Sequence, residues 1–249
     1  MTNVVQRNGV RIVAFNKSGH ASIVNTFSCS AGKDPQRGER GLEVLRGTWD
    51  KAKDFPQPHV TITYFRHPLA RVASVYNYFF TLAREEQMSK KFFGGLFPTL
   101  EPKDLQAKIG KTEFRKNLSA MGFTQTMSFQ QFCNHLVHGR VNLSDDLHLR
   151  RQADSLRECG NEDSCTYYRR LEDIATVWPR MVDELKLDCT KKIAHFNNKK
   201  YTKWEVMFMG LTHLRAEVKK LYKEDFEIWN MLSCNETGET FPSVGHEAS

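Results

Sequence analysis

The sequence predicts an α/β protein in which helices flank a central, mostly parallel sheet. Two apolar segments, Val10–Phe15 and Val60–Phe65, are typical of buried strands, and each is followed by a polar turn and a segment with helical spacing. Strands that alternate with helices favour a parallel sheet. The 249 residues contain no linker-like tract, so we expect one domain with a core over about 10–231 and a flexible tail over about 235–249.

The turn after the first strand has the features of an anion-binding site. It reads Asn16-Lys17-Ser18-Gly19 and leads into a helix that we expect over Ala21–Cys29. The glycine lets backbone N–H groups approach an anion closely, and the start of the helix supplies partial positive charge. The lysine supplies a full positive charge. This turn therefore predicts a phosphate-binding loop.

The second strand leads into a complementary anion-binding segment. Val60–Phe65 is followed by Arg66 and then by Pro68, and proline favours the first turn of a helix. Arg66 stands at the mouth of the strand, where a guanidinium suits bidentate contact with phosphate. Ser74 follows about two helical turns later and faces the same anion if the strand end folds back toward the helix. Each strand is thus expected to deliver one anion clamp.

Further helices complete the expected core. A helix over Ser128–His138 is indicated by a capping box between Ser128 and Gln131 and by Gly139 just past its end. Another is expected over Lys203–Tyr222. Pro179 fits a helix if Thr176 is the cap, which places the proline in the first turn.

At the two anion clamps the chain resembles the sulfotransferases that use 3′-phosphoadenosine 5′-phosphosulfate (PAPS), specifically the carbohydrate sulfotransferase (sulfotransferase family 2-like) branch. In that family an Arg-Asp-Pro…Arg…Ser…Tyr segment grips the 3′-phosphate through its Arg and Ser, and a Pro-Lys-Thr-Gly-like loop grips the 5′-phosphosulfate. The matching residues here are Arg66-His67-Pro68, Arg71, Ser74 and Tyr76 for the first and Asn16-Lys17-Ser18-Gly19 for the second. The chain departs from the family at Asn16, His67 and Ala21.

Three later segments extend the resemblance toward the carboxyl end. Asp146–Gln152 is similar to the family's Asp-x-His-x-x-Pro-Gln segment. Tyr168–Asp173 is similar to a strand and turn of the family that runs from a Tyr to a Glu, and Leu221–Glu227 is similar to its closing Leu-Tyr-x-x-Asp-Phe-Glu helix. Arg151 replaces the proline of the first segment. The resemblance implies a three-layer P-loop-like fold and the transfer of a sulfuryl group from PAPS to a hydroxyl of a carbohydrate.

The resemblance assigns residues to both ends of the cofactor. Lys17 and the backbone N–H groups of the first turn would neutralise charge on the departing 5′-phosphate, and Arg66 would fix the 3′-phosphate. The basic turn at Lys199 and Lys200 either closes over phosphate or is a solvated surface turn. The cofactor-binding residues expected are Lys17, Ser18, Gly19, His20, Ala21, Ser22, Arg66, Ser74, Lys199 and Lys200. The sequence demands no metal.

No local motif identifies the residue that removes the proton of the acceptor hydroxyl. A His or a carboxylate with a suitable pKa is needed, and in related enzymes it often lies between the two phosphate motifs. Candidates there are Glu39, Glu43, Asp50, Asp54 and His59, and His148 resembles a family His near the acceptor side. The expected catalytic set is Lys17, His20, His59 and Glu43. His20 either orients the sulfuryl group or contributes only its backbone N–H.

The net charge of +7 and a pI near 9.1 favour anionic partners. An acidic polysaccharide acceptor fits this charge, whereas nucleic acid is not expected because the chain has no nucleic-acid-binding motif. Two alternatives stay open. One is a non-catalytic anion- or glycan-binding protein of the same fold. The other is a kinase of related fold, which is disfavoured because its triphosphate loop needs glycine where the chain has Arg11 and Asn16.

The amino end lacks the apolar stretch of a secretory signal, and no segment is apolar for long enough to cross a bilayer. We therefore expect a soluble, cytoplasmic protein, unless the chain is a fragment of an anchored one. The six cysteines are too few for a disulfide scaffold. The resemblance leaves open a local bridge between Cys159 and Cys165.

Overall fold

A computed structural model describes residues 3–15, 20–33, 44–77, 80, 117–124, 126–159, 166–193 and 203–234. Of His20 and Ala21 it describes only the backbone. Several expectations fall outside the described residues, namely those on Lys17, Ser18, Gly19, Glu39, Glu43, Cys165, Lys199, Lys200 and the tail from 235.

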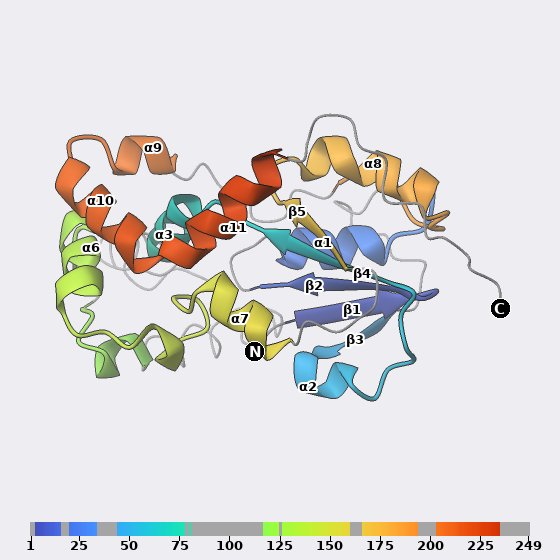
Figure 1. Ribbon diagram of the computed structural model, residues 1–249, viewed down its shortest axis with the longest axis horizontal. Coiled ribbons are helices and arrows are strands. Elements are labelled where there is room, and N and C mark those ends of the chain that lie inside the picture. The colour runs from blue at the N-terminus through green and yellow to red at the C-terminus, as the bar shows by residue number, and fades with distance from the viewer. Residues whose placement is uncertain are drawn as a thin grey trace, which may run out of the picture.

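The centre of the described fold is a five-stranded sheet (Figure 1). Its strands are β1 (Asn3–Arg7), β2 (Val10–Ala14), β3 (Leu45–Thr48), β4 (Val60–Phe65) and β5 (Thr166–Arg170), in the order β3-β1-β2-β4-β5. β2 pairs with β4 and β4 with β5 in parallel, whereas β1 pairs antiparallel with β2 and with β3. The expected strands β2 and β4 are confirmed, but the expectation of a mostly parallel sheet is wrong, because the sheet is mixed.

A tight hairpin is the reason for the antiparallel half. Asn8 and Gly9 connect β1 to β2 and both have positive φ, 48° and 73°. A two-residue loop of this kind suits the right-handed twist of an antiparallel pair, and Asn-Gly is the preferred sequence for it. Arg7 therefore pairs directly with Val10, and β1 lies beside β2 where a second parallel strand was expected.

Helices cover both faces of the sheet. α1 (His20–Phe27) and α8 (Ile174–Glu184) pack on the face that carries Ile12 and Ile62. The opposite face carries Val13 and Phe65, because successive strand residues point to opposite sides. The helices on that face are α2 (Trp49–Ala52), α7 (Gln152–Glu158) and α11 (Lys223–Cys234). The α/β class with flanking helices is thus confirmed.

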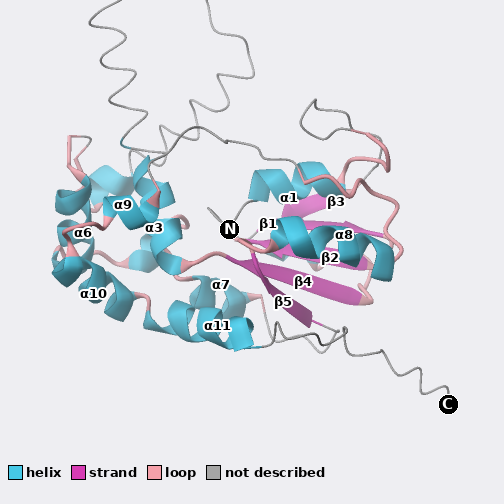
Figure 2. Ribbon diagram, turned by 90° about the horizontal axis from the view of Figure 1, so that it is seen from above, coloured by secondary structure: helices cyan, strands magenta, loops and turns pink. Residues whose placement is uncertain are grey.

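A separate group of helices lies beside the sheet, on the left in Figures 1 and 2. It consists of α3 (Pro68–Tyr76), α6 (Phe129–His138), α9 (Trp204–Met207) and α10 (Thr212–Leu221). Buried side chains such as Val75, Phe132 and Val218 form its core. β4 leads directly into α3, so this helical group adjoins the carboxyl ends of the parallel strands.

Helix starts agree with the sequence better than helix interiors do. α3 begins at Pro68, and the Ser128–Gln131 capping box of α6 is present in both directions. The single helix expected over Lys203–Tyr222 is wrong, because the chain is divided into α9 and α10 by a turn in which Gly210 has a φ of 76°.

Pro179 also differs from the expectation. α8 begins one turn earlier than expected, with Asp173 as its N-cap, so Pro179 lies inside the helix. The proline has no N–H to donate to the carbonyl of Ala175, and one helical hydrogen bond is lost there. No helix among the described residues is long and apolar enough to cross a membrane.

Candidate anion-binding site

The two strands that precede the expected anion clamps end at the same edge of the sheet. β2 and β4 are adjacent and parallel, and their register runs from Val10 opposite Val60 to Ala14 opposite Tyr64. Their carboxyl ends therefore lie side by side, which is where parallel sheets hold ligands. The chain after β2 enters α1 at His20, and the chain after β4 carries Arg66 and enters α3 (Figure 2).

Arg66 is the first residue beyond β4, and its backbone is held by a side chain. Its N–H donates to Oε1 of Gln152 over 2.9 Å, and Nε2 of Gln152 donates to the Arg66 carbonyl over 2.9 Å. Burial lowers the pKa of the Arg66 guanidinium, and the Glu172 carboxylate acts in the opposite direction. Arg66 is thus a partly buried cation at the edge of the sheet, with an acidic neighbour from the turn after β5.

Ser74 lies in α3, the helix that follows Arg66 along the chain. Every other residue of α3 is buried, and Ser74 alone in this helix is partly exposed. Its position near the end of α3 places it about 9 Å along the helix axis from Pro68. Ser22 is likewise partly exposed, in the first turn of α1. The structure therefore places Arg66 and the backbone start of α1 after adjacent strand ends, whereas Ser74 lies further along α3.

His59 lies at the other end of the sheet. Its N–H donates to the carbonyl of Gly9 over 2.7 Å, next to the β1–β2 hairpin, and its side chain is exposed. The six residues of β4 separate it from Arg66, a span of about 20 Å. The expectation that His59 acts as the base at the site of Arg66 is corrected, because a ligand held at the carboxyl edge does not reach the amino edge.

His67 is enclosed by aromatic side chains that the sequence analysis did not connect with it. Its ring stacks on Trp204 with the centroids 4.6 Å apart, and it meets the rings of Phe226 and Trp229 edge-on at 5.4 Å each. Its backbone N–H donates to Oε1 of Glu172 over 3.0 Å. Burial lowers the pKa of the His67 ring to about 4, so the ring is neutral at physiological pH. Where the family that the chain resembles has a carboxylate, this chain therefore has an uncharged group next to Arg66 in the sequence.

The low pKa of His67 predicts a loss of stability on acidification. The folded-state pKa of about 4 lies below the usual 6.5, so between these values the unfolded chain binds the proton more strongly and folding weakens as pH falls. After burial, the charges of Lys219, Arg170 and Arg215 also lower the pKa, and Glu205 raises it. Because the ring is only partly buried, we expect its titration to cost about 1 kcal/mol between pH 7.5 and pH 5.

Urea unfolding at the two pH values measures this loss. His67→Phe retains an aromatic ring against Trp204 but cannot be protonated, so its unfolding free energy should fall less than that of the wild type. His138→Asn is the matched control, because His138 is an exposed histidine on α6. Equal losses in the wild type and in His67→Phe would show that His67 is not the group responsible.

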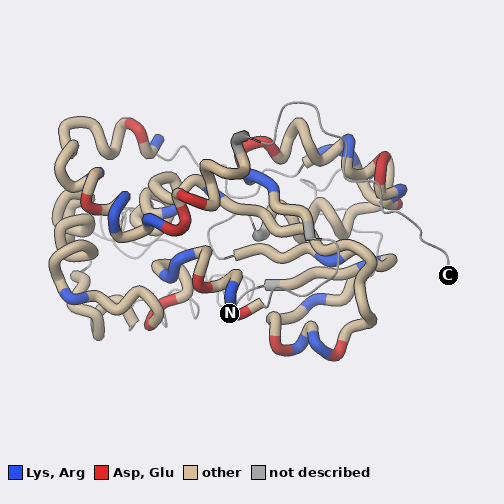
Figure 3. The backbone as a smooth tube through the Cα atoms, viewed as in Figure 1, with Lys and Arg blue, Asp and Glu red and all other residues tan. Residues whose placement is uncertain are grey.

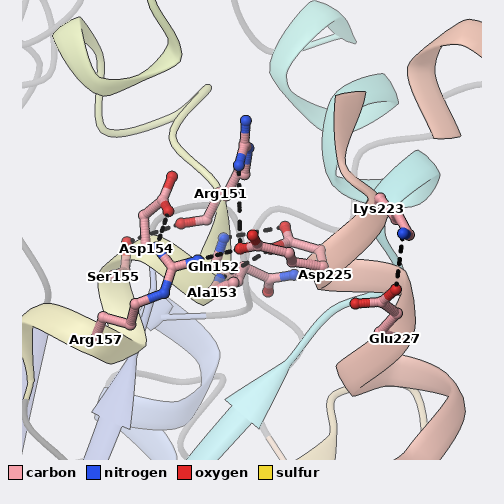
Figure 4. A network of polar contacts seen from close by, with 10 residues as sticks. Arg151, Gln152, Ala153, Asp154, Ser155, Arg157, Lys223, Asp225 and Glu227 are labelled. Atoms are coloured by element: carbon pink, nitrogen blue, oxygen red, sulfur yellow. Dashed lines mark hydrogen bonds and ion pairs between the residues drawn. The ribbon is translucent and has the colours of Figure 1, made fainter. Parts of the chain in front are cut away.

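A carboxylate from α11 fixes the start of α7 (Figure 4). Asp225 is 1% exposed, and its two oxygens accept the N–H groups of Gln152 and Ala153 over 3.0 and 2.9 Å. Burial raises the pKa of Asp225, and the guanidinium of Arg71 is the largest opposing influence. Arg71 is itself buried in α3 and donates to the carbonyl of Leu147 over 3.2 Å. α7 and α11 are thus joined by hydrogen bonds, and α3 is joined to the segment before α7.

Asp146 and His148 form a local pair in the segment before α7. Oδ1 of the buried Asp146 accepts the backbone N–H of His148 over 2.8 Å and lies 3.2 Å from Nδ1 of the same residue. A carboxylate at this distance orients an imidazole ring. His148 remains a candidate proton acceptor on this geometry.

An open cavity of about 640 Å³ borders the start of α7. Its lining includes Arg150, Arg151 and Arg157, but Arg150 pairs with Glu158 and Arg157 with Asp154. Basic and acidic residues are interspersed in the same way along the rest of the described backbone (Figure 3). This cavity therefore does not select an anionic ligand by charge.

Among the described residues, no group of three or more His, Cys, Asp or Glu side chains is arranged to hold a metal ion. Comparison of the chain with protein-family models, characterised proteins and solved structures gave no match.

Proposed function

We propose that the protein is a PAPS-dependent sulfotransferase that moves a sulfuryl group to a hydroxyl of a carbohydrate acceptor. The observation that carries the proposal is that β2 and β4, the strands that precede the two expected anion clamps, are adjacent and parallel, so that both end at the same edge of the sheet. PAPS has phosphate groups at both ends of its ribose, and a pair of neighbouring clamps suits such a ligand. In this proposal β2, β4 and β5 with α1 and α3 form a P-loop-like core.

The proposed reaction is an in-line displacement at sulfur. The bond between sulfur and the 5′-phosphate oxygen breaks, a bond to the acceptor oxygen forms, and the acceptor proton passes to a base. Lys17 and the backbone N–H groups at Ser18, Gly19, His20 and Ala21 would stabilise the charge that develops on the departing phosphate. Glu43, His20 and His148 remain candidates for the base.

The 3′-phosphate would be held by Arg66 and Ser74. A guanidinium in a partly buried site gives a strong, directed contact with phosphate because less water competes for it than on an open surface. The neutral ring of His67 adds no negative charge next to that phosphate. Lys199 and Lys200 would close over the cofactor from the carboxyl-terminal half of the chain.

Nucleotide binding followed by a transfer assay tests the proposal. Calorimetric titration should show that 3′,5′-adenosine diphosphate (PAP), the desulfated product, binds at least about tenfold more tightly than ATP. Radiolabelled sulfate should then pass from PAPS to one or more members of a polysaccharide panel. A preference for ATP would favour the kinase alternative. Tight PAP binding without transfer to any acceptor would favour a non-catalytic binding protein, and absence of PAP binding would contradict the proposal.

A further inference from the structure

At the point where the sheet ends, the side-chain amide of Gln152 makes the backbone hydrogen bonds that a neighbouring strand would make. The β4–β5 ladder reaches Phe65 opposite Arg170, and the Phe65 carbonyl still accepts the N–H of Leu171 over 2.7 Å. One residue further, the N–H of Arg66 donates to the side-chain oxygen of Gln152. The side-chain NH₂ of Gln152 donates to the carbonyl of Arg66. Gln152 is 0% exposed, so water does not compete for these two bonds.

The amide of Gln152 is itself held in place from behind. Gln152 is the first residue of α7, and Asp225 of α11 accepts the backbone N–H groups of Gln152 and Ala153 (Figure 4). Figure 4 shows Asp225 reaching from α11 toward these two residues. The direction in which the Gln152 side chain leaves α7 is therefore set by a buried carboxylate on another helix.

The peptide group after Arg66 is held as well. The N–H of His67 donates to Glu172, which follows β5. The backbone of Arg66 and His67 thus has hydrogen bonds to side chains from two other parts of the chain, and these bonds set the direction in which the Arg66 side chain leaves the backbone. A side chain whose backbone is fixed in this way loses less conformational entropy when it binds a ligand.

We infer that Gln152 is a positioning residue, which holds the backbone of Arg66 so that the guanidinium meets the 3′-phosphate of the cofactor. This inference rests on the proposed function. Glutamine suits the task because one planar amide supplies both a donor and an acceptor. Neither glutamate, which only accepts when ionised, nor methionine, which does neither effectively, can make both bonds at neutral pH.

Two substitutions at position 152 test the inference through PAP affinity. Gln152→Met has similar volume but makes neither bond, and we expect it to weaken PAP binding about tenfold or more at every pH. Gln152→Glu loses the donor at pH 8 and regains it when the carboxyl group is protonated. Its PAP affinity, expressed relative to the wild type, should therefore recover between pH 8 and pH 5.5, whereas that of Gln152→Met should not.

The pH response of Gln152→Glu depends on the charged groups around position 152. The charged groups around this position are Asp225 on α11, Arg71 on α3, Glu172 after β5 and Arg66 itself. Burial and the carboxylates of Asp225 and Glu172 favour the protonated acid, whereas Arg71 and Arg66 favour the ionised form. At Asp225 and at Glu172 burial outweighs these same two arginines and raises the pKa, so we expect the titration at position 152 to fall within the measured range. Division by the wild-type affinity at each pH removes the titration of PAP and of His67.

Gln131→Met is the matched control. The Gln131 side chain also accepts a backbone N–H, that of Ser128 over 2.8 Å, but it does so at the start of α6. Gln131→Met should lower the unfolding midpoint while leaving PAP affinity within twofold of the wild type. If the wild type binds PAP and Gln152→Met binds equally well, or if Gln152→Glu shows no recovery at low pH, the positioning role is overturned. If the wild type itself does not bind PAP, the proposed function fails and the inference fails with it.

Discussion

Replacement of Arg66 by alanine is expected to weaken PAP binding at least about a hundredfold. The reason is that Arg66 is a cation at the carboxyl edge of the sheet and that its backbone is fixed by Gln152. A charge-assisted contact in a partly buried site is worth more than one on an open surface. Calorimetric titration with PAP measures the loss, and this prediction rests on the proposed function.

Two further variants distinguish the effect of the Arg66 charge on PAP affinity from the effects of hydrogen-bond geometry and of removing an arginine elsewhere on the fold. Arg66→Lys keeps the positive charge but cannot make two parallel hydrogen bonds, so its affinity should lie between those of the wild type and Arg66→Ala. Arg180→Ala removes an exposed arginine of α8 that pairs with Glu184 one helical turn away, and it should leave PAP affinity unchanged. Unchanged affinity in a folded Arg66→Ala protein would remove the 3′-phosphate assignment.

The strands that carry the site could be predicted from sequence, but the direction of their neighbour could not be inferred from strand patterns alone. Apart from Arg11, β2 and β4 consist of apolar, aromatic or β-branched residues, and every residue of both is buried. The hairpin that makes the sheet mixed was signalled by Asn8-Gly9 directly before β2, a pair that favours a two-residue turn. The antiparallel strand β1, which directly precedes this turn, is not among the strands expected from the sequence.

The position of His59 could also have been deduced from the sequence. A residue that precedes a parallel strand lies at its amino end, whereas ligands of such sheets bind beyond the carboxyl ends. Proximity in sequence to the phosphate motifs was therefore a poor guide to proximity in space. Arg66 directly follows β4, and the same rule places it at the carboxyl edge.

The contacts that hold the site together lie beyond sequence reasoning. Gln152 is 86 positions from Arg66, and Asp225 is 73 positions from Gln152. No local periodicity relates residues so far apart, because such pairs are set by the packing of α7 and α11 on the sheet. The aromatic surroundings of His67 had a partial signal, since Phe226 and Trp229 are three residues apart and share one face of α11.

Replacement of Asp225 by asparagine is expected to destabilise the fold by about 3 kcal/mol, the largest stability effect that we predict. The carboxylate accepts the N–H groups of Gln152 and Ala153, and the asparagine amide has only one oxygen to offer them. The substitution also removes a negative charge next to the buried guanidinium of Arg71. A buried cation that loses a counter-charge is costly, because the protein interior solvates it poorly. Urea unfolding at neutral pH measures the change in free energy.

A double-mutant cycle tests whether the charge of Arg71 accounts for this loss. Arg71→Met alone should also destabilise, because it leaves the Asp225 carboxylate without its strongest opposing charge. The double variant Arg71→Met, Asp225→Asn should lose at least about 1 kcal/mol less than the sum of the single losses, since neither charge is then left alone. Asp183→Asn is the matched control, an exposed carboxylate on α8 that pairs with Lys191, and it should cost under about 0.5 kcal/mol. Strictly additive losses in the cycle would mean that Asp225 acts on the fold through the start of α7 alone and not through Arg71.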